Sequence, residues 1–110
     1  MTNVDSSTYL RKLRGVADHA EAHGLADTIQ TVGVAVGITV FVERYPAEAS
    51  REVLRQWARS LGATEVERDG SYLVVRGVLV DGQEAKAVAH APQSPAVRVS
   101  APLDEIEALR

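Results

Sequence analysis

The chain of 110 residues contains no cysteine, which excludes disulfide bonds and thiolate metal sites. Aromatic residues are scarce, with one Trp, one Phe and three Tyr, so the core must be built from Val, Leu, Ile and Ala. No apolar run approaches the roughly 18 residues of a membrane span, and the N-terminal segment has no apolar signal core. We therefore expect a cytoplasmic protein that does not enter a membrane.

Acidic residues outnumber basic residues, and the formal net charge is −3. This balance argues mildly against a general affinity for nucleic acid or anionic membranes. The length predicts a single domain over residues 1–110, in which residues 1–5 form a loose tail.

What the chain does have is a regular alternation in residues 28–43, where every even position from Val32 to Val42 is Val or Ile. Period-two patterning predicts a strand with one buried face. One straight strand of this length would span about 53 Å, against a domain diameter of roughly 34 Å. We therefore predict a hairpin with Gly37 at positive φ and Val32 opposite Val40. A single bent strand with a glycine bulge is the alternative.

Helical spacing on either side of this stretch predicts two helices. The first follows N-cap candidates at residues 5–7 and ends before Gly24, and the second runs from Pro46 to just before Gly62. Trp57 is the expected core anchor of the second helix. The apolar stripe of the first helix consists of Tyr9, Leu10, Leu13, Val16, Ala17 and Ala20.

Two Asp-Gly pairs, at 69–70 and 81–82, predict two-residue hairpin turns between three strands at 63–68, 71–80 and 83–91. This register places Arg76 opposite Ala87 and leaves one face of the last strand all alanine, which lets a helix approach closely. Residues 92–102 are expected to be a loop containing a short edge strand at 96–100, before a short C-terminal helix. The predicted fold is an α+β two-layer sandwich in the order α-β-β-α-β-β-β-(α), mainly antiparallel, with helices on one face.

Three groups of side chains are candidates for chemistry. His19 and His23 are four residues apart on a helix and could chelate a metal, although a solvated His19 and a His23 interacting with the helix C-terminus are the simpler interpretation.

The second group is Arg51, Arg55 and Arg59, which form a basic ridge that could bind phosphates or an acidic protein. Glu48 and Glu52 flank this ridge, so an ion-paired surface is the simpler interpretation.

The third group is Glu65 and Glu67 with Arg76, which we interpret as an edge strand with a cross-strand ion pair and not as a catalytic carboxylate pair. No Gly-rich phosphate loop and no serine elbow is present. We therefore expect no enzymatic activity and no cofactor.

The run from His19 to Leu25, HAEAHGL, followed by Trp57-Ala58-x-x-Leu61-Gly62, resembles small uncharacterised proteins of actinobacteria and their phages. The similarity covers roughly residues 8 to 80. It implies a phage or mobile-element setting and two strands before the Trp helix, and it carries over no binding or catalytic residue.

The function expected from the sequence is a non-catalytic protein–protein interaction or regulatory module, with a homodimer expected if a sheet face or edge strand lacks cover. A nucleic-acid-binding regulator using Arg51, Arg55 and Arg59 is the alternative, and a metal-dependent enzyme at His19 and His23 is a further one. The candidate partner-binding residues are Thr31, Thr39, Phe41, Arg51, Arg55 and Arg59.

Overall fold

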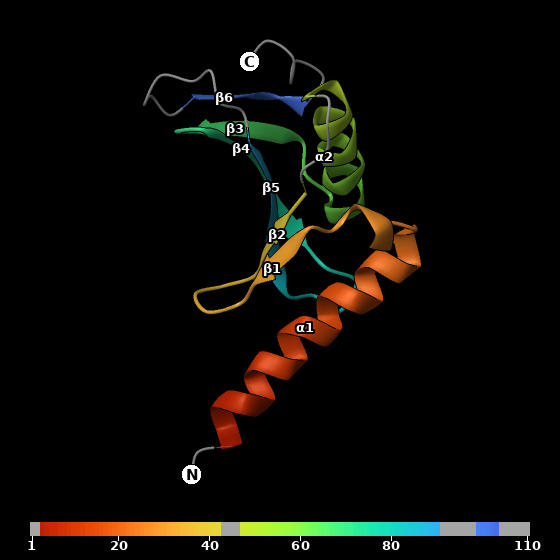
Figure 1. Cartoon of the computed structure of the whole chain (residues 1–110), viewed down its shortest axis with the longest axis vertical. Coiled ribbons are helices and arrows are strands. Elements are labelled where there is room, and N and C mark those ends of the chain that lie inside the picture. The colour runs from red at the N-terminus through yellow and green to blue at the C-terminus, as the bar shows by residue number, and fades with distance from the viewer. Residues whose placement is uncertain (1–2, 43–46, 91–98, 104–110) are drawn as a thin grey trace.

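The computed structural model describes residues 3–42, 47–90 and 99–103, and these form two α-helices and a six-stranded sheet (Figure 1). The elements are α1 Asn3–His23, the 3-10 helix η1 Ala26–Thr28, β1 Thr31–Gly33, β2 Thr39–Phe41, α2 Ala47–Leu61, β3 Glu65–Asp69, β4 Tyr72–Val78, β5 Glu84–His90 and β6 Val99–Pro102. The predicted α+β class and element order are confirmed. The predicted C-terminal helix lies outside the described residues.

The sheet has the strand order β1-β2-β5-β4-β3-β6. Its pairs are antiparallel except for β2 and β5, which run parallel. The β1–β2 hairpin is therefore attached to the meander through β5. β3 lies between β4 and β6, so the prediction that Glu65 and Glu67 occupy an edge strand is wrong.

The alternating stretch forms the predicted hairpin, with Val32 opposite Val40 and Gly37 at a φ of 130°. On the even face Val34, Ile38, Val40 and Val42 are buried, whereas Val36, in the hairpin loop, is exposed. Burial of one face explains why the register follows the alternation, since a slip of one residue would expose every one of the buried side chains.

The β4–β5 hairpin differs from the prediction by one residue. Its loop has three residues, 80–82, because the Gly82 N–H donates to the Leu79 carbonyl at 2.9 Å and the Leu79 N–H donates to the Gln83 carbonyl at 2.8 Å. Gly82, at a φ of 91°, takes the left-handed position that a three-residue hairpin loop requires. Arg76 therefore faces Lys86, and the predicted pairing of Arg76 with Ala87 is wrong.

Both ends of the chain depart from the predictions. α1 begins at Asn3, so the predicted loose tail is wrong for residues 3–5. Asp5 falls within the first turn instead of preceding the helix, a position where the helix dipole favours acidic residues. Of the predicted loop over 92–102, the described residues 99–102 form β6, an edge strand that continues past the expected end at residue 100; pairing with β3 provides partners for its backbone.

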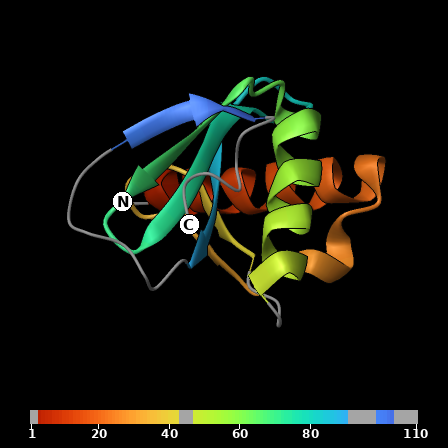
Figure 2. The ribbon, with the colours of Figure 1, turned by 90° about the horizontal axis from the view of Figure 1, so that it is seen from above.

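α2 lies along one face of the sheet, which we call the inner face, and contacts β4 and β5 (Figures 1 and 2). The core between them contains Leu54, Trp57 and Leu61 from α2 with Leu73 and Val75 from β4. The alanine column of β5 lies on this face, as predicted, and Ala85, Ala87 and Ala89 are buried.

The C-terminal half of α1 joins this core, where Val16 and Ala20 are buried. Figure 1 shows the N-terminal half extending away from the sheet, which makes the molecule elongated at 46 × 28 × 24 Å. Tyr9 and Leu10, predicted to belong to the buried stripe, are therefore exposed. Gly15 lies against the β4–β5 loop: a Cβ there would sit 2.8 Å from a carboxylate oxygen of Asp81.

Trp57 is fully buried, and its indole N–H donates to the Thr28 hydroxyl at 2.7 Å. That hydroxyl donates in turn to the Leu25 carbonyl at 2.6 Å. We expect Trp57→Phe to lower the free energy of unfolding by about 1–2 kcal/mol, because the ring is largely kept while one buried hydrogen bond is lost. Urea unfolding followed by circular dichroism measures this, since the variant has no tryptophan fluorescence.

Thr28→Val is the matched control, because it removes the other partner. The double variant should be less destabilised than the sum of the two single variants, since neither buried group is then left unsatisfied. Strict additivity would show that the Trp57–Thr28 bond does not contribute.

Candidate functional site

The structure places His19 in the core and not in solvent. Its side chain is fully buried and stacks on Trp57, with ring centroids 5.6 Å apart. The Val80 N–H donates to Nδ1 at 3.0 Å, so Nε2 carries the ring proton and donates to the Ser60 hydroxyl at 2.8 Å. The interpretation of His19 as a solvated residue is therefore wrong.

Both ring nitrogens of His19 thus make hydrogen bonds, which connect α1 to α2 and to the β4–β5 loop. Neither nitrogen therefore has a lone pair left to bind a metal. His23 is exposed, with its ring centroid 4.6 Å from that of His19. Within residues 3–42, 47–90 and 99–103, no three His, Cys, Asp or Glu side chains are grouped so as to hold a metal ion. Burial and the neighbouring His23 lower the pKa of His19, while Asp81 opposes this shift.

The three arginines of α2 do not form the predicted ridge. Arg51 is only 8% exposed, Arg55 donates to Glu52 at 2.7 Å, and Arg59 is exposed beside a hollow of about 420 Å³ that His23 also lines. The physical reason is helix geometry: each step of four residues turns about 40° further around the axis. Arg51 and Arg59 therefore project from the helix in directions that differ by roughly 80° around its axis.

The sheet face opposite α2, which we call the outer face, carries no described helix (Figures 1 and 2). The strand register arranges its side chains in cross-strand rows. One row is Phe41, Val88, Val74 and Glu67, and the next is Gly33, Thr39, Lys86 and Arg76. Thr31, Thr39 and Phe41 share this face, as the alternation predicts.

Aromatic side chains lie in the first of these rows and next to it. The Tyr72 ring lies 6.5 Å from that of Phe41 and 5.4 Å from that of His90. Val74 and Val88, in the same row, are buried although no helix of the described residues packs on this face. The described part of the outer face therefore has an apolar centre.

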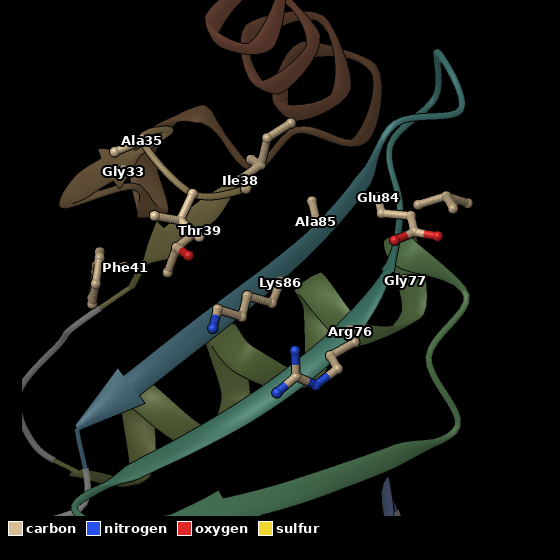
Figure 3. A pocket seen from close by; sticks show the side chains of 13 residues that line it. Gly33, Ala35, Ile38, Thr39, Phe41, Arg76, Gly77, Glu84, Ala85 and Lys86 are labelled. Atoms are coloured by element: carbon tan, nitrogen blue, oxygen red, sulfur yellow. The ribbon is translucent and has the colours of Figure 1, made fainter. Parts of the chain in front are cut away.

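A hollow of about 720 Å³ opens on the outer face beside this row. β2 pairs with β5 over only three residues, and beyond Ile38 the hairpin loop diverges from β5. The hollow lies in this gap and takes in the loop residues 35–37, Thr39 and Phe41 on one side, and Arg76, Val78, Glu84 and Lys86 on the other (Figure 3).

Lys86 and Arg76 stand directly opposite each other on neighbouring strands. Like charges in this arrangement are destabilising. Arg76 is partly compensated by Glu67, 3.4 Å away. A cross-strand ion pair therefore forms, but it is made by Glu67 and not by Glu65, which is exposed. The ammonium group of Lys86 makes no ion pair or hydrogen bond within the described part of the chain.

Sequence reasoning missed Lys86 as a site residue and placed Arg76 opposite an alanine. The sequence does place Lys86 two residues after Glu84, on the same face of the strand. Which residue lies opposite Lys86, however, depends on the β4–β5 register. Chemically, the hollow combines apolar walls with a pair of cations. Such a surface can hold an apolar side chain together with an anionic group.

No helix within the described residues is long and apolar enough to cross a bilayer. No protein-family model, no curated protein and no solved structure matches the chain, so the resemblance noted from the sequence stays a prediction.

Proposed function

We propose that this protein is a non-catalytic protein–protein interaction module that binds its partner through the outer face of the sheet. The observation that carries the proposal is the hollow beside Phe41, which combines apolar walls with the Lys86–Arg76 pair. Specific interfaces commonly have an apolar core with enriched aromatic and arginine side chains.

In this proposal the setting is a phage or mobile element, as the resemblance implies, and the neighbouring genes would test that setting.

A site-specific photo-crosslinker tests the proposed surface in the host cell. We expect benzoylphenylalanine at Thr39, inside the hollow, to form cross-linked protein products that the same residue at Gln56, exposed on α2, does not form. Adding Lys86→Glu to the chain that carries the cross-linker at Thr39 should reduce these products, because it reverses a charge in the hollow. Identical products from both positions, or none from Thr39, would rule out binding through this face.

A further inference from the structure

The hollow has two chemically different ends, defined by the register of β4 and β5. Val78 lies opposite Glu84 at one end, and Arg76 lies opposite Lys86 two residues along each strand. Figure 3 shows the charged ends of Lys86 and Arg76 on the same side of the hollow, with Glu84 toward its other end. The hollow is therefore polarised from a mixed apolar and acidic end to a cationic end.

The apolar end is open to solvent. Val36, in the hairpin loop, is 99% exposed and Val78 is 49% exposed, and both line the hollow. Covering Val78 with an apolar side chain removes its exposed surface from water. Glu84 beside Val78 disfavours a second carboxylate at this end, so it restricts where an acidic group can bind.

The cationic end favours an anion. A carboxylate placed between Lys86 and Arg76 would offset the repulsion between the two cations and accept hydrogen bonds from both. The chain as a whole is negatively charged, so this preference is local to the hollow and does not extend to acidic proteins in general.

From this polarity we propose that the hollow binds an extended partner segment in which a large apolar residue and an Asp or Glu are separated by one residue. In an extended chain, residues i and i+2 point to the same side and lie about 7 Å apart. The same spacing separates Val78 from Arg76 on β4, so the apolar side chain covers Val78 while the carboxylate reaches the cations. The inference rests on the proposed function and adds the chemistry of the partner.

Selection from a display library of random dodecapeptides tests the motif on four proteins: the natural chain, Lys86→Glu, Glu84→Lys and Arg59→Glu. We expect the natural chain to enrich peptides with an acidic residue two positions from a large apolar one. Lys86→Glu should lose that acidic preference, and Arg59→Glu, a matched charge reversal on α2, should keep it. Glu84→Lys should allow the acidic residue of the selected peptides at other distances from the apolar one, because the substitution removes the acidic group from the apolar end.

Binding affinities of two peptides then measure how much Lys86 contributes to recognition of the acidic residue. A fluorescein-labelled GSLSESG peptide should bind the natural chain more tightly than GSLSQSG in anisotropy titrations, and Lys86→Glu should weaken the acidic peptide about tenfold while leaving the glutamine peptide nearly unchanged. Circular dichroism of each variant verifies that it is folded.

The outcomes separate this inference from the proposed function. If selected peptides bind the outer face without an acidic preference, or if Lys86→Glu leaves the preference intact, the motif is wrong while the interaction surface stands. If no peptide is selected and Thr39 yields no cross-links, both are wrong. A dimer in light scattering that Lys86→Glu dissociates would instead identify a second copy of the chain as the occupant and overturn the peptide motif.

Discussion

Gly77→Ala is expected to lower the free energy of unfolding by about 3 kcal/mol or more, enough to prevent folding if the protein is marginally stable. Gly77 lies on β4 where the C-terminal end of α2 approaches the sheet. A Cβ at this position would overlap the carbonyl oxygen of Leu61 and lie 2.8 Å from its carbonyl carbon. Because these are backbone atoms, relief requires moving the helix and not merely rotating a side chain.

Gly33→Ala is the matched control for this prediction. Gly33 also lies in a strand, but an added Cβ would meet nothing within 4 Å and the residue does not adopt a positive φ. Its unfolding free energy should stay within about 0.5 kcal/mol of the natural chain. Equal urea midpoints for the two variants would show that α2 does not approach β4 as closely as described.

His19→Gln is expected to lower the free energy of unfolding by about 2–3 kcal/mol at pH 7.5, because a buried ring that contacts Trp57 and joins three elements is lost. The same substitution should remove a pH dependence. The folded protein holds His19 in its neutral form, with a pKa below the ordinary value of 6.5. Between that lowered pKa and pH 6.5 the unfolded chain binds a proton that the folded chain does not.

Because of this difference in bound protons, the folded protein becomes less stable as the pH falls. Stability from His19 is fully present above pH 6.5 and is lost as the pH falls toward the folded pKa, with a slope of at most about 1.4 kcal/mol per pH unit. Asp81, whose pKa is lowered by hydrogen bonds from Gln83, titrates below its ordinary value of 3.8 and lies outside this window.

Urea unfolding at several pH values between 5 and 7.5 measures the slope. We expect His90→Gln, which removes an exposed histidine from the outer face, to keep the slope that His19→Gln removes. If acidification destabilises both variants equally, His19 is not the group responsible.

Much of the fold could be predicted from local pattern. Gly24 and Gly62 mark the ends of both helices because each adopts a positive φ, and the N–H groups of Leu25 and Ala63 then donate to the carbonyls of Ala20 and Ala58, both at 2.8 Å. The hairpin register could be predicted because one face of it had to be buried. The outer-face residues Thr31, Thr39 and Phe41 follow from that register.

The rest of the site could not be predicted from the sequence. His19 is spaced like a surface residue, and only the packing of α1 against α2 and the β4–β5 loop buries it. Arg51 likewise loses its exposure through packing and not through any local signal.

The sequence by itself determined the elements, their order and the faces of the first hairpin, because these depend on periodicity and on glycine positions within a few residues. Only the tertiary structure decided which strands are neighbours and how β4 aligns with β5. A loop of three residues instead of two changes that alignment by one, which places Lys86 opposite Arg76 and creates the cationic end of the hollow. The Asp-Gly pair is compatible with both loop lengths. The pair alone therefore does not set the alignment, which also depends on which side chains are buried, and in the observed register Leu73, Val75 and Leu79 are buried.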